Sequence, residues 1–472
     1  MNFVVALLAF SLLRAGDAPK HSEAVSERVD GVVKQAMAKY HIPGLSIAVV
    51  RDGKIAMTKG YGLANLESMR RASPESIYQL ASVSKQFTAT AVMKLVESGK
   101  INLDEPISAY LKDTPETWSK VTARHLLTHT SGIKSYTETA GFFANGNQRK
   151  DYTKKELIDL VRNLPLDFEP GTQWHYDNTG YYLLGMLIEQ VSGQPYDQFL
   201  AQSIFKPLGM AHTRLNSRAD VIPERVIGYS WRGNDWGNAE FVSPTQPFAA
   251  GALVSNVLDM AKWDAALYTE TVLKKESLQQ MWTRVVLKSG EKADYGFGWS
   301  VGEVNKRRDI QHGGGIDGFS TQISRFVDDK LTVIVLTNSD GGRAEKVANE
   351  VAALYEPALK VVVAAPKTVA DDNPARSKFL KGILLEAAEG RANADLFTPA
   401  TAQLIVPRIQ QEGKRMFATF GEMKSFALVE RAEKDGKTRL RYLVTYAAAK
   451  MNATYIVNKD GKIEGLNLQP AE

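Results

Sequence analysis

Strand-like segments occur at both ends of the first 358 residues of this 472-residue chain, and mainly helical sequence separates them. Near the N-terminus, Leu45–Val50 and Ile55–Tyr61 flank a turn at Arg51–Lys54, a pattern typical of a β-hairpin. Three downstream segments have the same strand-like character: Tyr295–Val301, Gln322–Phe326 and Leu331–Leu336. Because a lone hairpin is barely stable in water, we expect these distant segments to complete one antiparallel sheet, flanked by helices and interrupted by an inserted helical subdomain.

Helical periodicity and linker composition give the remaining organisation. Helices are expected at Val25–Tyr40, Ala123–His129, Lys154–Leu164, Gly180–Val191, Tyr196–Phe205 and Arg343–Tyr355. Residues 359–378 contain two prolines and an Asp-Asp-Asn run, which predict a linker between domains 19–358 and 379–472. The second domain should be a small α+β unit, with a helix followed by strands at Ser425–Ala432, Thr438–Tyr446 and Ala453–Val457. The expected fold class is therefore α/β (α+β).

The first 18 residues have the character of a signal peptide. The apolar run Phe3–Leu13 is too short to span a bilayer, and small residues follow it up to Ala18, where cleavage is expected. No lysine or arginine precedes the run, so an uncleaved N-terminal anchor near a membrane is the alternative. We expect a periplasmic or secreted protein.

Composition excludes several kinds of site. The chain has no cysteine, which rules out disulfides and thiolate catalysis. Its net charge of +5 is not concentrated in any block of lysine and arginine, so nucleic-acid binding is not indicated. His125 and His129 are four residues apart, but Leu126 stands where a zinc-binding motif needs glutamate. We therefore expect these histidines to be structural, and no metal or other cofactor.

Ser82-Val83-Ser84-Lys85 is the first candidate catalytic motif. Serine and lysine three positions apart face each other across one helical turn, so the amine can reach a hydroxyl that is by itself a weak nucleophile. The same spacing occurs at Ser131/Lys134, Ser203/Lys206 and Ser289/Lys292. Only Ser82 lies between a strand-like apolar run and an amphipathic helix, where free amides and the helix dipole favour developing negative charge.

Two further motifs could complete a site around Ser82. Tyr176-Asp177-Asn178 lies in a loop that opens the Gly180–Val191 helix, although Tyr176 alone could equally be a packing residue. His312-Gly313-Gly314-Gly315 follows the Tyr295–Val301 segment. Glycines on a strand let the backbone approach a ligand closely, and the alternative is a simple hairpin turn.

In this order, the three motifs resemble those of the serine β-lactamase and DD-peptidase superfamily, in particular its class C-like branch. The stretches HLLTHTSG from His125, FEPGTQWHYDNTGYYLLGMLIE from Phe168 and HGGGIDGF from His312 are similar to family signatures, and the resemblance covers about residues 25 to 358. The C-terminal domain resembles the nuclear-transport-factor-like α+β cone, because helices precede long strands there.

The resemblance implies a role for each residue of the motifs. Ser82 would be the acylated nucleophile, and Lys85 and Tyr176 would share the work of general base and general acid. Asn178 would hydrogen-bond to substrate and to Lys85. The backbone amides of Ser82 and Gly315 would form the oxyanion hole, and the strand with His312 and Gly314 would bind substrate.

The chain departs from the family pattern at position 312. The family often has Lys-Thr-Gly where His312-Gly313-Gly314 stands. A second segment, Lys288-Ser289-Gly290, fits that motif, but it precedes the strand and its neighbours indicate a solvated turn. A histidine is mostly neutral near pH 7, so His312 should anchor a substrate carboxylate less well than lysine. We therefore expect weak or absent β-lactamase turnover, and esterase or D-aminoacyl hydrolase activity instead.

These observations predict an exported serine hydrolase that acts through an acyl-enzyme on a small-molecule or peptide substrate. The scissile bond would be an amide or ester, in a D-amino-acid peptide, an ester or a β-lactam-like compound. The alternative is a penicillin-binding or peptide-sensing protein without turnover, with a ligand-binding C-terminal domain. Trp231, Trp236 and Phe241 either line the pocket or pack elsewhere, and the sequence leaves the oligomeric state open.

Overall fold

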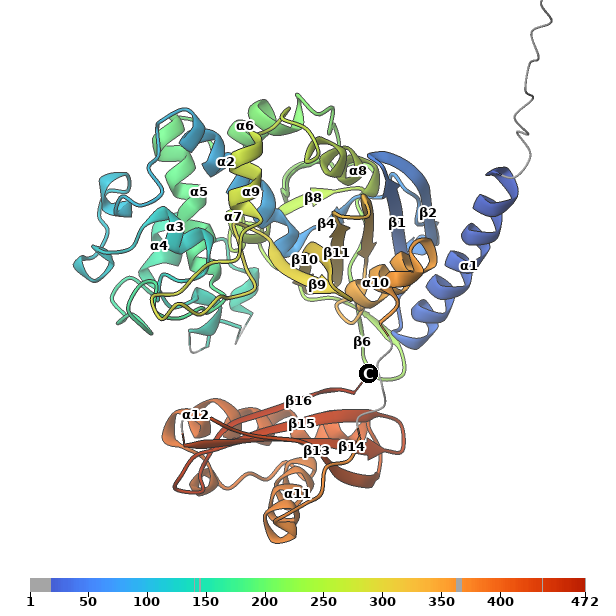
Figure 1. Ribbon diagram of the computed structural model, residues 1–472, viewed down its shortest axis with the longest axis vertical. Helices are drawn as coiled ribbons and strands as arrows, with labels where there is room; N and C mark the ends of the chain where they lie inside the picture. The colour runs from blue at the N-terminus through green and yellow to red at the C-terminus, as the bar shows by residue number, and fades with distance from the viewer. Residues whose placement is uncertain (1–17, 140, 144–145, 362–366, 435, 472) are drawn as a thin grey trace, which may run out of the picture. The chain divides into compact units, whose positions relative to one another are not determined.

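The computed structural model of the 472-residue chain describes residues 18–139, 141–143, 146–361, 367–434 and 436–471 (Figure 1). The chain divides into two compact units, residues 1–360 and 361–472. The predicted signal segment lies outside the described residues apart from Ala18, which begins helix α1 (Ala18–Lys39). No helix in the described ranges is both long and apolar enough to cross a membrane.

A seven-stranded antiparallel sheet forms the centre of the first unit, as the sequence predicted. Its strand order is β3-β2-β1-β12-β11-β10-β9. The strands are β1 (Gly44–Arg51), β2 (Lys54–Asn65), β3 (Arg70–Arg71), β9 (Ser300–Val304), β10 (Arg307–Ile316), β11 (Phe319–Phe326) and β12 (Leu331–Thr337). The N-terminal hairpin joins the distant strands through β1 and β12, where Leu45 lies opposite Thr337.

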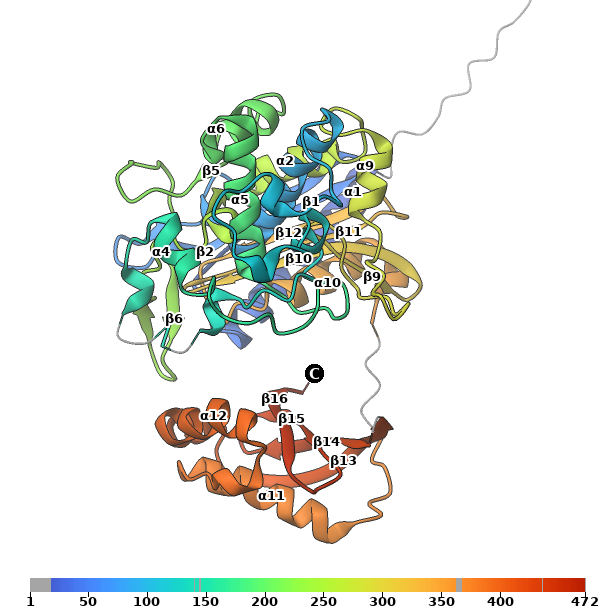
Figure 2. The same ribbon diagram turned by 90° about the vertical axis from the view of Figure 1, so that its left-hand side faces the viewer.

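The central strand β1 is buried on both faces because two layers of helices cover it. Leu45, Ile47 and Val49 belong to an apolar cluster with α1 and α10 (Ala344–Tyr355), on one side of the sheet. The alternate residues Ala48 and Val50 belong to the larger cluster on the other side, which includes α8 (Val257–Ala266) (Figure 1). Figure 2 gives a second view of β1, β12 and α10. Burial on both faces explains why β1 is apolar throughout rather than alternating.

The inserted region is mainly helical and extends from the large apolar cluster. Its helices are α2 (Lys85–Glu97), α3 (Ala123–Leu127), α4 (Lys154–Asp159), α5 (Asn178–Ser192), α6 (Tyr196–Leu200), α7 (Phe248–Gly251) and α9 (Lys275–Met281). Short strands accompany them: β4 (Tyr78–Gln79), β5 (Arg214–Leu215) and β8 (Leu253–Ser255) form one sheet, and β6 (Tyr229–Trp231) pairs with β7 (Trp236–Asn238).

One strand prediction was misplaced. Tyr295–Val301 was expected to be a strand, but β9 begins only at Ser300, and Gly298 has a left-handed φ of 75°. The next strand, β10, contains His312-Gly313-Gly314-Gly315, so this motif lies on a strand and not in a hairpin turn.

The second unit is a separate α+β domain. Its antiparallel sheet has the order β13-β14-β15-β16, and Tyr442 and Tyr455 of the sheet share a buried apolar cluster with Leu380 of helix α11. The elements are α11 (Pro374–Ala388), α12 (Pro399–Arg408), α13 (Lys414–Ala418), β13 (Met423–Lys434), β14 (Lys437–Tyr446), β15 (Lys450–Val457) and β16 (Ile463–Pro470). Helix α11 starts within the segment predicted as linker. The nuclear-transport-factor-like resemblance stays a prediction.

Candidate active site

Ser82 lies on a 3-10 turn, η1 (Ala81–Ser84), that joins β4 to α2. The turn is fixed from two sides: Thr321 on β11 donates a hydrogen bond to the Leu80 carbonyl at 2.8 Å, and the Leu253 amide donates to the Ser84 hydroxyl at 3.1 Å. Ala81 has a left-handed φ of 48°, which is unfavourable for a residue with a side chain. These contacts hold Ser82 at the start of α2, as the sequence predicted.

Lys85 is completely buried and its amine contacts Ser82. The Lys85 Nζ lies 3.1 Å from Ser82 Oγ, 2.9 Å from Asn178 Oδ1 and 2.8 Å from the Ala250 carbonyl oxygen. Burial lowers the pKa of Lys85 from 10.5 to about 7, although the charge of Asp177 opposes the decrease. Two of the three partners can only accept hydrogen bonds. A neutral Lys85 therefore donates to Asn178 and Ala250 and directs its lone pair at the Ser82 hydroxyl.

Tyr176 covers the Lys85 amine. The Lys85 Nζ lies 4.8 Å from the centroid of the Tyr176 ring and 5.4 Å from that of Tyr181. Burial raises the pKa of Tyr176 above its usual value of 10, and a hydrogen bond to Ser82 opposes the increase. Tyr176 is therefore a protonated phenol at neutral pH. It can relay a proton by donating its own and then accepting another, but it cannot act first as a base.

Asp177 and His129 position the Tyr176 loop. The Asp177 carboxylate caps α5 by accepting hydrogen bonds from the amides of Thr179 at 2.7 Å and Gly180 at 3.0 Å. The Asp177 amide donates to His129 Nδ1 at 3.0 Å, and the His129 ring packs on Tyr176 with centroids 4.3 Å apart. Burial lowers the pKa of His129 well below 6.5, so it is a neutral, structural histidine as expected.

His312 is buried and neutral. Its Nδ1 lies 2.6 Å from the Gly313 carbonyl, which can only accept, so Nδ1 carries the proton and Nε2 accepts from the Tyr295 hydroxyl at 2.8 Å. Burial, together with the charge of Lys85, lowers the pKa of His312 to about 3. His312 thus contributes no positive charge to the site.

The edge of β10 next to η1 has no strand partner among the described residues. Pairing with β9 stops at Gln311 opposite Ser300, and the following residues of β10 approach η1. A Cβ on Gly314 would lie 2.2 Å from the Leu80 carbonyl oxygen, so glycine allows this close approach, to the protein backbone rather than to a ligand. A Cβ on Gly315 would meet no atom within 4 Å, and Gly315 lines the cavity with Ser82.

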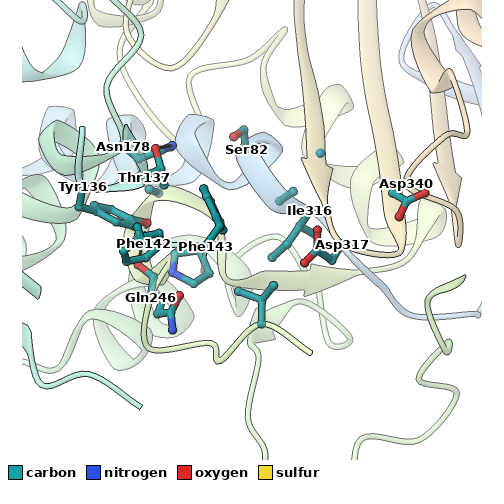
Figure 3. A pocket seen from close by; sticks show the side chains of 16 residues that line it. Ser82, Tyr136, Thr137, Phe142, Phe143, Asn178, Gln246, Ile316, Asp317 and Asp340 are labelled. Carbon is teal, nitrogen blue, oxygen red and sulfur yellow. Dashed lines mark hydrogen bonds between the residues drawn. The ribbon is translucent and has the colours of Figure 1, made fainter. Parts of the chain in front are cut away.

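A cavity of about 460 Å³ opens beside Ser82 (Figure 3). Its lining combines Ser82, Asn178 and Gly315 with an aromatic and apolar wall. The residues of that wall that the sequence did not single out include Tyr136, Phe142, Phe143, Val242, Pro247 and Ile316. Except for Ile316, which ends β10, the wall comes mainly from loops with no periodic signal, so local sequence patterns could not identify its residues.

The aromatic residues left open by the sequence lie outside this lining. Trp231 stacks on His41 with centroids 4.0 Å apart, and Trp236 packs on the edge of Trp231. Phe241 lines a neighbouring cavity of about 320 Å³ that shares Val242 and Asp317 with the first. The two tryptophans are packing residues.

The Lys288-Ser289-Gly290 motif and one possible metal-binding group do not form part of the site. Lys288 is exposed and its Nζ lies 3.0 Å from Glu169 Oε1, in a turn where Gly290 has a φ of 85°, as expected for a solvated turn. In the described part of the chain, Glu138, Asp167 and His175 are close enough to share a metal ion. All three are exposed to solvent.

The members of this three-residue group are already paired within the protein. The Lys134 Nζ lies 2.6 Å from Asp167 Oδ1, and His175 Nε2 lies 3.1 Å from Glu138 Oε1. The group therefore has partners without a metal ion.

Comparison with known proteins gives a consistent set of matches. The family model described as Beta-lactamase matches residues 29–356. Penicillin-binding protein 4* of Bacillus subtilis (strain 168) is 33% identical over 311 residues, which are 62% of this chain and 68% of that protein.

Solved structures share the fold. The octameric penicillin-binding protein homologue from Pyrococcus abyssi has a TM-score of 0.63 at 24% identity, covering 95% of this chain and 98% of that one. A D-stereospecific amidohydrolase from Streptomyces sp. has a TM-score of 0.60 at 29% identity, covering 69% of this chain and 98% of that one.

Proposed function

Because this chain belongs to the beta-lactamase family and is a serine hydrolase, we propose that it cleaves amide or ester bonds of D-amino-acid derivatives through an acyl-enzyme on Ser82. The observation that carries the proposal is the position of the Lys85 amine between Ser82 Oγ and two fixed acceptors. That arrangement supplies a base to a serine at the edge of a substrate-sized cavity.

Acylation uses the neutral form of Lys85. Its amine takes the proton of Ser82 as Oγ attacks the substrate carbonyl carbon, and the carbonyl oxygen becomes an anion. The amides of Ser82 and Gly315 stabilise that anion. The proton then passes through the Tyr176 hydroxyl to the leaving nitrogen or oxygen as its bond to carbon breaks, which leaves an ester on Ser82.

Deacylation reverses the proton path. Water attacks the ester carbon and loses a proton to the Lys85 and Tyr176 pair, and the same two amides hold the second oxyanion. Collapse breaks the bond to Ser82 Oγ, which regains its proton, and the acid is released. No step requires a metal or organic cofactor.

Substrate preference follows from the charge of the site. β-Lactams and peptides ending in D-Ala-D-Ala carry a carboxylate near the scissile bond, whereas His312 is neutral and no cationic side chain lines the described cavity. The similarity to a D-stereospecific amidohydrolase supports D-amino-acid amides as substrates, with β-lactams turned over slowly. Export remains part of the proposal and is supported by the apolar run Phe3–Leu13.

A second candidate is a penicillin-binding or peptide-sensing protein that acylates without turnover. The similarity to penicillin-binding protein 4* favours it. The two candidates differ only after acylation, because a sensor keeps the acyl group and a hydrolase releases it.

The test is steady-state hydrolysis of p-nitrophenyl acetate and a chromogenic cephalosporin. Three proteins are compared: wild type, Ser82→Ala and Ser289→Ala, the last removing a serine with the same spacing to a lysine. We expect many turnovers of the ester by wild type and Ser289→Ala, none by Ser82→Ala, and slow cephalosporin hydrolysis. One equivalent of product without turnover would support the sensor, and equal rates in wild type and Ser82→Ala would refute both.

A further inference from the structure

Asp317 is an unpaired carboxylate inside the cavity that contains Ser82. It is the first residue of the two-residue turn between β10 and β11, two residues beyond Gly315 (Figure 3). Its side chain is exposed to the cavity and forms no hydrogen bond or ion pair with any described residue. A carboxylate in such a position is open to a ligand.

The cavity around Asp317 carries negative charge without compensation. Asp317 and Asp340 are its only ionisable carboxylates, and the described lining includes no lysine, arginine or histidine. Asp340 accepts a hydrogen bond from the Ser230 hydroxyl, and Glu240 is paired with Arg149. Burial, followed by the charges of Asp340 and Glu240, raises the pKa of Asp317. A bound cation would relieve this repulsion.

Gln246 lies in another wall of the same cavity and is held rigidly by hydrogen bonds. Gln246 is only 2% exposed, and its Nε2 donates to the carbonyls of Asn147 and Lys150, both at 2.8 Å. Both hydrogens of the amide are therefore used, and Oε1 has no partner among the described residues. Oε1 has almost no accessible surface, so Gln246 fixes this wall through its two donated hydrogen bonds and leaves Asp317 as the polar group open to a ligand.

Position along β10 connects Asp317 to the reacting carbonyl. Gly315 is the candidate oxyanion donor, and two residues of even a fully extended chain span at most about 7 Å, so the Cα atoms of Gly315 and Asp317 lie within about 7 Å of each other. An aspartate side chain spans part of this distance. The α-nitrogen of an amino-acid derivative is two bonds from the carbonyl carbon. It can therefore lie between the carbonyl held by Gly315 and the Asp317 carboxylate.

Resting on the proposed function, we infer that the preferred substrate has a free ammonium group next to the scissile carbonyl, and that Asp317 binds this group. A D-amino acid amide, or a peptide with an unblocked N-terminal D-residue, has this chemistry. An N-acylated substrate would place a neutral amide against Asp317 and would leave its charge uncompensated.

The test compares D-alanine p-nitroanilide with N-acetyl-D-alanine p-nitroanilide. Wild type, Asp317→Asn and Asp328→Asn are assayed, the last as a matched control in the turn between β11 and β12, outside the cavity. Wild type should prefer the free amine by about 10- to 100-fold in kcat/KM, the range expected for a hydrogen bond to a charged group. Asp317→Asn should remove most of this preference. Asp328→Asn should keep the preference of the wild type.

The outcomes separate this inference from the proposed function. Equal use of both anilides by wild type, or an unchanged preference in Asp317→Asn with a wild-type melting temperature, would overturn the ammonium site. Hydrolysis of the uncharged p-nitrophenyl acetate by wild type but not Ser82→Ala would show that the proposed function survives that result. Failure of wild type on all three substrates would overturn both.

Discussion

Replacement of Gly314 by alanine should damage catalysis through the backbone that carries Ser82. The new Cβ would lie 2.2 Å from the Leu80 carbonyl oxygen and 2.3 Å from Thr321 Oγ1, whereas ordinary contact begins near 3.4 Å. Strand β10 and turn η1 must therefore separate by about 1 Å, which also strains the hydrogen bond from Thr321 to Leu80. A displacement of this size at reacting groups costs about 100-fold in rate, and overpacking costs about 1–3 kcal/mol of stability.

The assay is kcat/KM for p-nitrophenyl acetate together with the melting temperature. Gly302→Ala is the matched control, because it places the same methyl group on the neighbouring strand β9, where its only close atom is the Asp309 carbonyl oxygen at 4.0 Å. We expect a loss of about 100-fold in Gly314→Ala and little change in Gly302→Ala. Wild-type kinetics in Gly314→Ala, or equal losses in the two variants, would refute the reasoning.

Three further predictions follow from charges. The kcat/KM for an uncharged ester should rise with pH around an apparent pKa of about 7, because Lys85 loses its proton there. It should then stay level to pH 9, because the pKa of Tyr176 lies above 10. A decline above pH 7 would contradict Lys85 as the base. Arg325→Met should lower the free energy of unfolding by about 3–5 kcal/mol in a denaturant titration, because Arg325 pairs at 2.7 Å with the equally buried Asp264; adding Asp264→Leu should recover part of the loss. Lys288→Ala should leave kcat/KM unchanged, since this lysine is exposed and pairs with Glu169; a large loss would return Lys288-Ser289-Gly290 to the list of candidate motifs.

Local sequence patterns predicted the parts of the site that depend on local geometry. Ser82 and Lys85 meet because three residues make one helical turn, and this holds wherever the helix lies in the fold. Asn178 begins α5 because Asp177 is a good N-cap residue. The sequence predicted a mostly neutral His312 because the ordinary pKa of histidine lies below 7, and burial lowers that pKa further.

Contacts between distant segments could not be predicted in this way. The Ala250 carbonyl, which fixes the Lys85 amine, lies 165 residues further along the chain. Tyr295, Phe297 and Trp299 alternate as in a half-buried strand and are indeed buried. Gly298 has a left-handed φ and turns the chain between them, so these residues do not form a strand. The alternating pattern therefore predicted their burial correctly but predicted the wrong secondary structure.

The low pKa of Lys85 has to come from burial in this site. A lysine at position 312, as the family often has, would add a positive charge near Lys85 and disfavour its ammonium form. His312 is neutral and cannot do this, although it is close enough for the charge of Lys85 to lower its pKa. The rings of Tyr176 and Tyr181 cover the amine, so they keep water away from it. The closed packing around Lys85 is therefore as necessary for a reactive Ser82 as the serine–lysine spacing itself.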